Sequence, residues 1–404
     1  MREYVKMTKE QIDRTMSKIH YSLLTGILFW GGLVVVSSLY VTIPLISIFA
    51  RTFDLSPEEA SWTSSAFSLS YAVGFLVFGS LTERLGRKNI MVVGLSILTI
   101  VTFIISLLDT YRLLVAFRAM QGFAAASFAP AALAYVVKMF PEEKRVTTIG
   151  FLSTGFLMAG IVGQLISSFL YQYVGWKGVF VFLAGLYCVS LFLLAKLPRD
   201  QIGKKPTHSL RFVEQIQKLL TQKELVFCFA ITFTLLLTFV GMYTVLGSDL
   251  SQSFGMNPQQ VLSVRTMGIF GMFLSPFAGI LIRRFQIHTV LRVGLTLALF
   301  GLAIMGIYHN VVLLITMSVV YVAGISLTIP TLIVLIGQLG GSARDFAISL
   351  YTFILFIGAT LGPIMAVRIL QISSYPFTFE VLAVLLGISL IFAFFIKEPN
   401  LKVN

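Results

Sequence analysis

Charged side chains are scarce in this chain of 404 residues. Lys, Arg, Asp and Glu together make up 12% of the sequence, whereas hydrophobic residues make up 57%. Soluble domains carry about 25% charged residues. The composition therefore excludes a soluble globular protein and predicts an integral membrane protein.

Cysteine and histidine are also rare, with two and four copies. Cys188 and Cys228 both fall within apolar runs, which argues against a disulfide framework or a metal-binding cluster. The sequence contains no phosphate-binding loop with Lys-Ser/Thr and no Ser-His-Asp arrangement at useful spacing. We therefore expect neither ATP hydrolysis nor another enzyme activity, and no cofactor or metal.

The apolar residues gather in segments of about 20 residues or more, the length that spans a bilayer. We predict twelve such helices, at 21–46, 60–81, 90–108, 111–137, 146–170, 177–195, 225–247, 260–282, 289–308, 311–336, 346–370 and 376–396. The expected organisation is an N-terminal arm (1–20), a six-helix bundle (21–195), a partly amphipathic linker (196–224), a second bundle (225–397) and a tail (398–404).

Basic residues outnumber acidic ones, 30 to 17, and are unevenly placed. If both termini lie on one side, that side holds 24 Lys and Arg, and the other holds Arg51, Arg112, Lys177 and Arg368. The positive-inside rule then places both termini in the cytoplasm. Because the basic residues lie between apolar runs, the net charge of +13 indicates contact with anionic lipid headgroups and argues against nucleic acid.

The two halves of the chain repeat each other. The matches, at offsets between 199 and 201, are 53–59 with 254–260, 79–95 with 279–295, Pro130 with Pro330, and Arg145 with Arg344. A series of matches at a nearly constant offset indicates an internal repeat.

A short basic loop joins the second and third predicted helices. It reads Gly79-Ser-Leu-Thr-Glu83-Arg84-Leu-Gly86-Arg87-Lys88. It resembles the signature loop of the major facilitator superfamily, G-x-L-x-D-R-x-G-R-K/R, with Glu83 in place of the usual Asp. The resemblance implies an all-α membrane protein with two pseudo-symmetric six-helix bundles, the major facilitator fold, and a substrate site between the bundles at the membrane midplane.

Arg118 lies inside an apolar segment, in the sequence Arg118-Ala-Met-Gln121-Gly122. An Arg at a helix centre costs about 2.5–3.5 kcal/mol on insertion scales, so it must face a polar cavity or partner. The sequence resembles the R-x-x-Q-G motif of proton-coupled drug antiporters in the same superfamily. This resemblance implies that Arg118 takes part in proton coupling or substrate binding. The alternative is that Arg118 only holds a polar network between helices.

The fifth predicted helix partly resembles the antiporter motif of the superfamily, G-x-x-x-G-P-x-x-G-G. Gly155 and Gly163 match it, whereas Gly160 replaces the Pro and Gln164 replaces a Gly. The resemblance implies export, and the alternative for these glycines is a helix-packing face.

Acidic residues are missing where many drug antiporters carry them. The segments 21–46, 225–247 and 311–336 contain no Asp, Glu, His, Lys or Arg, so nothing there would neutralise an organic cation. A proton route would then need a carboxylate near a membrane face: Glu83, Asp109, Asp249, Asp345 or Glu380. The resemblance implies that the first, fourth, seventh and tenth helices line the cavity. The candidates for substrate binding or proton coupling are Ser37, Tyr40, Arg118, Gln121, Gln164, Thr238, Tyr243 and Tyr321. For a single Ser or Thr, the alternative is a bond to its own helix carbonyl.

The charges at the cytoplasmic side are candidates for a gate that breaks as the halves rock. The gate and signature-loop candidates are Gly79, Glu83, Arg84, Gly86, Arg87, Lys88, Arg145, Arg344 and Asp345. The alternative is that they are solvated helix ends.

We therefore expect a monomeric transporter in the bacterial cytoplasmic membrane, surrounded by membrane lipids. It would export a small, neutral or anionic amphipathic compound in exchange for protons. The alternatives are a uniporter or organic-anion exchanger without proton coupling, and a non-transporting membrane sensor or scaffold.

Overall fold

The computed structural model describes residues 21–200, 217, 219–308 and 310–396. The predicted arm (1–20), most of the predicted linker (201–216 and 218) and the tail (398–404) lie outside the described residues. The side chains of three gate candidates, Glu83, Arg84 and Asp345, also lie outside the described part.

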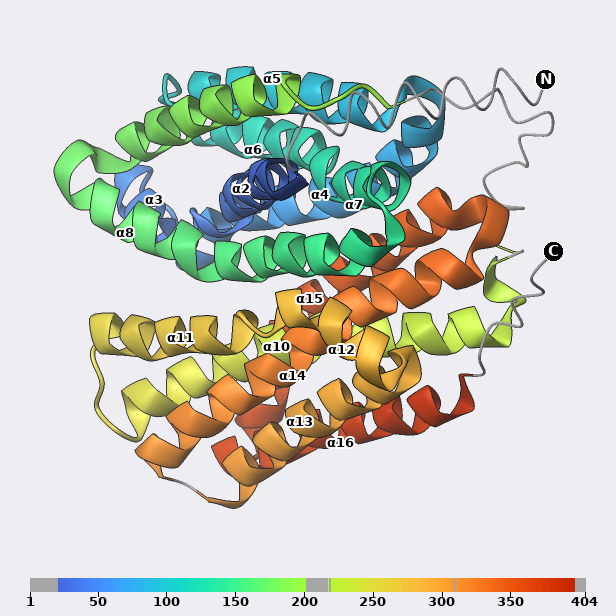
Figure 1. Cartoon of the computed structure of the whole chain (residues 1–404). Helices are drawn as coiled ribbons and strands as arrows, with labels where there is room; N and C mark the ends of the chain where they lie inside the picture. Colours follow the sequence, from blue (N-terminus) through green and yellow to red (C-terminus); the bar gives the residue numbers. More distant parts are fainter. Residues whose placement is uncertain (1–20, 201–216, 218, 309, 397–404) are drawn as a thin grey trace.

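Two bundles of helices form the molecule (Figure 1). The first holds α2 (Tyr21–Tyr40), α3 (Ile46–Thr52), α4 (Pro57–Leu85), α5 (Arg87–Ile105), α6 (Tyr111–Ala125), α7 (Phe128–Met139) and α8 (Glu142–Ala195). The second holds α10 (Lys223–Gln252), α11 (Pro258–Met272), η1 (Ser275–Phe277), α12 (Ala278–Phe285), α13 (Ile287–Ile307), α14 (Val311–Leu339), η2 (Gly341–Ala343), α15 (Arg344–Ile372) and α16 (Tyr375–Phe395). The all-helical fold class is confirmed.

Ten helical stretches of the described residues are long and apolar enough to cross a membrane. The kinked 54-residue α8 counts as one of these, and α4 is not among them. Gly175, at φ 65°, separates two helical parts of α8 where the sequence predicts a connection between 170 and 177. The count of twelve spanning helices and the cytoplasmic termini stay predictions.

Prolines explain two places where the helices differ from the predicted segments. The first predicted segment, 21–46, ends as a helix at Tyr40, because Pro44 lacks an N–H and its ring clashes with the carbonyl four residues earlier. The predicted segment 260–282 is divided into α11, η1 and α12, with Pro276 inside the 3₁₀ turn. Both breaks fall inside segments that the sequence predicts to span the membrane.

The repeat is visible in the backbone. Ser56 and Glu59 form a capping box at the start of α4, and Asn257 and Gln260 form the equivalent box at the start of α11. Gly86, at φ 85°, ends α4, and Gln286, at φ 68°, ends α12 exactly 200 positions later. Both halves therefore use the same local geometry to begin and to reverse corresponding helices.

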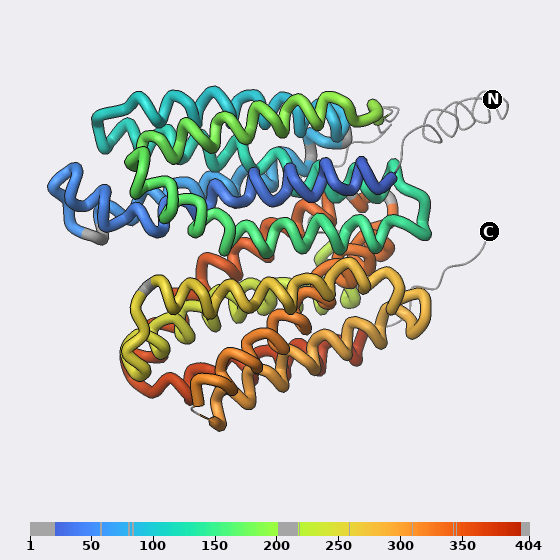
Figure 2. Tube along the Cα trace, turned by 60° about the vertical axis from the view of Figure 1, so that its left-hand side comes forward, coloured from blue at the N-terminus to red at the C-terminus, as the bar shows by residue number. Residues whose placement is uncertain are grey.

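One end of the molecule carries Arg87, Lys88, Arg145, Arg283 and Arg284 at its helix ends. We call it the basic face, and we call the other end the opposite face. Figure 2 shows that the described chain also begins and ends at the basic face. In both views α15 reaches from the second bundle to α4 and α7 of the first.

Candidate functional site

Small residues bring the two bundles into close contact near the basic face. A Cβ atom added to Gly150 of α8 would lie 2.7 Å from Cα of Pro276 in the second bundle. One added to Gly279 of α12 would lie 2.7 Å from Oγ1 of Thr147 in α8. A Cβ atom added to Gly79 of α4 would lie even closer to the side chain of Ser349 in α15. The glycines at these three places therefore let the bundles touch with almost no space between their backbones.

Hydrogen bonds and aromatic contacts join the bundles in the same region. The hydroxyl of Ser275 donates to the carbonyl of Gly150 at 3.0 Å, and that of Thr154 donates to the carbonyl of Met272 at 3.2 Å. Deeper in the molecule, the ring of Phe356 in α15 lies 4.9 Å from that of Tyr71 in α4. The bundles are thus closed against each other from the basic face to about mid-depth.

A cavity begins where these contacts end. Its inner part has a volume of about 40 Å³ and its outer part about 280 Å³. Tyr40, Leu157 and Phe239 line both parts. The outer part also reaches Gln164 of α8 and Arg265 of α11, which lie toward the opposite face. Both bundles contribute to a cavity that lies on the opposite-face side of the closed contacts.

The cavity is lined mostly by apolar and aromatic side chains. Its inner part is lined by Val36, Tyr40, Ala129, Leu133, Ser153, Phe156, Leu157, Leu236, Phe239, Ile329, Ile333, Tyr351, Thr352, Leu355 and Phe356. The outer part adds Ile43, Gly160, Ile161, Gln164, Val240, Tyr243, Thr244, Arg265 and Pro363. No carboxylate is among these lining residues, and Arg265 is their one charged side chain.

Arg265 is a cavity residue whose position in the sequence left two readings open, attraction of anions or extension outward to the membrane surface. Its Nη2 donates to the carbonyl of Tyr243 at 3.0 Å, and the Tyr243 hydroxyl donates to the Arg265 carbonyl at 3.5 Å. These bonds hold the half-buried guanidinium against α10 beside the cavity. From the sequence alone, a side chain two turns into a helix could equally extend toward the water. The sequence signal was its place inside an apolar segment.

Arg118 lies in a polar network within the first bundle and is fully buried. Its Nε donates to the carbonyl of Thr63 at 3.0 Å, and its Nη1 donates to the carbonyl of Ser38 at 3.1 Å and to Oε1 of Gln121 at 2.5 Å. Its Nη2 donates to the Thr42 hydroxyl at 3.2 Å. The guanidinium thus links α2, α4 and α6 with four hydrogen bonds.

The rest of this network extends the links. Gln121 Nε2 donates to the hydroxyl of Thr102 in α5 at 2.7 Å, and the guanidinium carbon of Arg118 lies 4.4 Å from the ring centre of Phe67. Neither Arg118 nor Gln121 lines the cavity in this conformation. Their role in substrate binding or proton coupling stays a prediction.

The other cavity candidates divide into two groups. Tyr40, Gln164 and Tyr243 line the cavity. Ser37 and Thr238 do not line it, and their hydroxyls donate to carbonyls of their own helices, at 2.7 and 2.8 Å. The fully buried Tyr321, also outside the lining, donates from its hydroxyl to that of Thr238 at 3.0 Å.

Two gate candidates, Arg145 and Arg344, contact neighbouring parts of their own half. Arg145 donates from Nε to the carbonyl of Phe140 at 2.8 Å, and Arg344 donates from Nε to the carbonyl of Gly337 at 2.6 Å. Each arginine therefore closes the turn between consecutive helices of one bundle. Arg145 also pairs with Glu142, at 3.5 Å.

Asp200 is a residue that the sequence did not single out. Its buried carboxylate accepts from the backbone N–H of Arg87 at 2.8 Å and of Lys88 at 3.1 Å, and Nη1 of Arg87 lies 3.4 Å away. An acidic group at a helix N-terminus satisfies orphan N–H groups and complements the helix dipole. Asp200 thus fastens the chain that leaves α8 to the start of α5, next to the signature loop.

The carboxylates proposed for a proton route differ in their surroundings. Asp109 pairs with Lys177 at 2.5 Å on the surface. Glu380 is exposed, whereas Asp249, near the end of α10 at the opposite face, is fully buried. Glu83 and Asp345 belong to the side chains outside the described part.

Comparison with known proteins identifies the architecture. A family model described as Major Facilitator Superfamily matches residues 28–342 and, in a second match, 229–404. An uncharacterized transporter of Buchnera aphidicola subsp. Schizaphis graminum is 26% identical over 372 residues, which cover 90% of each chain. The inner membrane transport protein YnfM of Escherichia coli is 25% identical over 270 residues, covering 65% of this chain and 64% of YnfM.

A solved structure has the same fold. The Escherichia coli fucose:proton symporter FucP superposes with a TM-score of 0.76 at 15% identity, covering 94% of this chain and all of that chain (100%). At this identity the likeness shows the fold alone.

Proposed function

The chain belongs to the Major Facilitator Superfamily and is a multi-pass membrane transporter, and we propose that it exports a small amphipathic compound by alternating access. The two bundles rock about the cavity, and the conformation described here is closed at the basic face. The excess of Lys and Arg supports a cytoplasmic basic face in a bacterial cytoplasmic membrane. In this arrangement the conformation is the one that releases its substrate to the outside.

The lining of the cavity is the observation that carries this proposal. Both bundles supply apolar and aromatic walls, and Arg265 is the only charge on them. Such walls bind an apolar body, and a few placed polar groups orient it. With a cation and no carboxylate on the walls, we propose a neutral or anionic amphiphile as the substrate.

Proton exchange as the driving force rests on the resemblance of the Arg118–Gln121 stretch to the motif of proton-coupled antiporters. An arginine cannot itself release a proton near neutral pH, so another group must carry it. Asp249 is our candidate, because it is buried and lies on the bundle that holds Tyr243 and Arg265.

The experiment uses purified protein in proteoliposomes with a pH-sensitive dye inside. We expect an added amphiphile to collapse an imposed pH gradient through the wild type and not through Asp249→Asn. The matched control is Asp109→Asn, whose carboxylate is exposed on the surface. Labelled substrate that crosses without any proton signal would refute proton antiport.

Substrate charge is tested by comparing a neutral and an anionic amphiphile. Removing the charge of Arg265 with Arg265→Gln should slow transport of the anion about 10- to 150-fold, since charge-assisted hydrogen bonds contribute about 1.5–3 kcal/mol and 1.4 kcal/mol corresponds to about ten-fold. Transport of the neutral compound should change little. Arg112→Gln, an exposed cation outside the cavity lining, serves as the control.

A uniporter or organic-anion exchanger is the second candidate. The absence of carboxylates from the cavity lining favours it, because no lining group is suited to exchange protons. It predicts anion exchange through the wild type with no change in the dye signal.

A further inference from the structure

A second pocket lies at the basic face and shares no lining residue with the cavity between the bundles. Its volume is about 600 Å³. α2 and the first turns of α8 form one wall, and the segment from Phe273 to Arg283 in the second bundle forms the other. It therefore lies across the junction of the two bundles.

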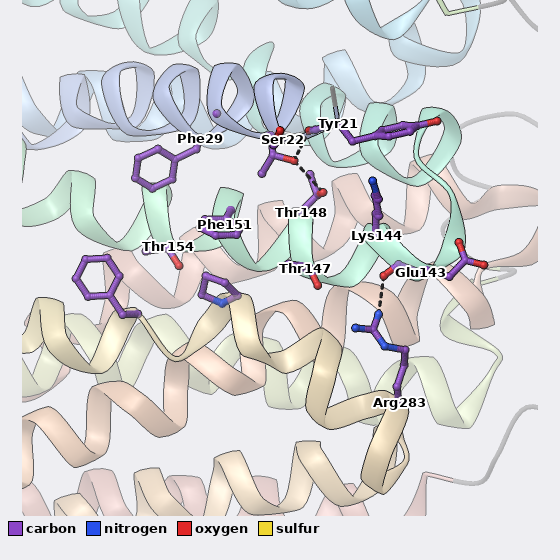
Figure 3. A pocket seen from close by; sticks show the side chains of 14 residues that line it. Tyr21, Ser22, Phe29, Glu143, Lys144, Thr147, Thr148, Phe151, Thr154 and Arg283 are labelled. Carbon is purple, nitrogen blue, oxygen red and sulfur yellow. Dashed lines mark hydrogen bonds between the residues drawn. The ribbon is translucent and has the colours of Figure 1, made fainter. Parts of the chain in front are cut away.

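The pocket is polar at one end and apolar at the other. Figure 3 shows Phe29 and Phe151 at one end and Lys144, Glu143 and Arg283 at the other. Phe151 and Phe273 are 40% and 51% exposed, and both lie in segments that the sequence predicts to span the membrane. Exposed phenylalanines on the wall of a pocket indicate that its apolar end is open sideways to hydrocarbon.

The charged end carries more positive than negative charge. Arg283 donates from Nη1 to the backbone carbonyl of Glu143 at 2.5 Å, and Nζ of Lys144 lies 4.6 Å from the ring centre of Tyr21. Neither cation is within ion-pair distance of a carboxylate among the residues that the structure describes. The carboxylate of Glu143 points away from the apolar end (Figure 3).

We propose that this pocket binds an anionic phospholipid of the leaflet at the basic face. The phosphate lies at the charged end, where Lys144 and Arg283 attract it, and an acyl chain lies along Phe29, Phe151 and Phe273. Basic pockets between membrane helices on the cytoplasmic side suit such headgroups. Because both bundles line the pocket, the bound lipid holds them together and stabilises the conformation that is closed at the basic face.

The first test measures binding of phosphatidylglycerol to the purified protein by native mass spectrometry, with phosphatidylcholine of the same acyl chains alongside. One basic residue near a membrane surface changes affinity about five-fold, so the double variant Lys144→Gln, Arg283→Gln should bind phosphatidylglycerol about 25-fold more weakly. The matched control is Lys196→Gln, Arg284→Gln. These two cations also lie at the basic face, over the rings of Phe192 and Phe285, but outside the pocket.

Three outcomes would overturn the proposal. They are equal weakening in the control variant, equal binding of phosphatidylcholine by the wild type, and displacement of phosphatidylglycerol by soluble glycerol phosphate, which would indicate a site for a free anion.

A second measurement leaves the basic residues in place, in case the double variant fails to fold. A photo-crosslinking phenylalanine analogue at Phe151 should capture phosphatidylglycerol more efficiently than phosphatidylcholine. The same analogue at Phe300, which is 53% exposed on α13, should capture both lipids equally. Equal capture of the two lipids at Phe151 would contradict the proposed site.

Discussion

Replacing Gly150 by alanine should open the basic face. The added Cβ would lie 2.7 Å from Cα of Pro276 and 2.8 Å from the carbonyl carbon of Ser275. Both are backbone atoms, which cannot rotate away as a side chain can. Since ordinary contact begins at 3.4 Å, the two bundles must separate here by at least 0.7 Å.

The magnitude follows from the cost of overpacking, about 1–3 kcal/mol. The contact between Gly150 and Ser275 joins the two bundles only when the basic face is closed, so the whole cost falls on that conformation. Because 1.4 kcal/mol corresponds to a ten-fold change, the equilibrium should shift about 5- to 150-fold toward the conformation open at the basic face.

The assay reports exposure of the cavity from the opposite face. Gln164→Cys, in a chain without Cys188 and Cys228, places a single thiol on the cavity wall. A membrane-impermeant maleimide added outside should label it more slowly after Gly150→Ala.

The control is Gly185→Ala on the same helix, where an added Cβ meets no atom within 4 Å. Gly185→Ala gains the same helix propensity as Gly150→Ala, about 1 kcal/mol. It should leave the rate of labelling at position 164 unchanged. Equal labelling in the two variants would refute the idea that the close contact at Gly150 holds the basic face shut.

Three further predictions concern stability in detergent, measured as the midpoint of thermal unfolding. Asp200→Asn should destabilise the protein by about 1.5–3 kcal/mol, because its buried carboxylate accepts two backbone hydrogen bonds; Asp109→Asn at the surface should cost less than about 1 kcal/mol, and equal effects would contradict this. Arg118→Lys should lower the midpoint, because an ammonium group lacks the planar fork that reaches α2, the turn after it and α4; an unchanged midpoint would show that the network adds no stability. Gln286→Gly should stabilise by up to about 1 kcal/mol and Gly86→Gln should destabilise, since both positions have positive φ; the opposite signs would rule out backbone strain at this turn.

Several features of the site were expected from the resemblance of the sequence to the family. Tyr40, Gln164 and Tyr243 were expected at the cavity and line it. The functional role of every candidate stays a prediction, and the side chains of Glu83 and Asp345 lie outside the described part.

Other features depended on how helices are rotated against each other. Arg118 and Arg265 look alike in the sequence, each an arginine inside an apolar segment. Carbonyls of α2 and α4 enclose Arg118, whereas Arg265 lies beside the cavity. Asp200 reaches the start of α5 only because the chain folds back after α8.

The sequence by itself determined that this protein is a membrane transporter built from a repeated helical bundle, and it predicted the orientation. Apolar length, basic connections and the repeat are properties of neighbouring residues, and the bilayer acts on them directly. Only the tertiary structure decided which face is closed, which arginine lines the cavity and which acid caps a distant helix. Those outcomes arise from contacts between residues at least 22 positions apart, such as Tyr243 with Arg265 and Gly150 with Ser275, and helical periodicity carries no information about them.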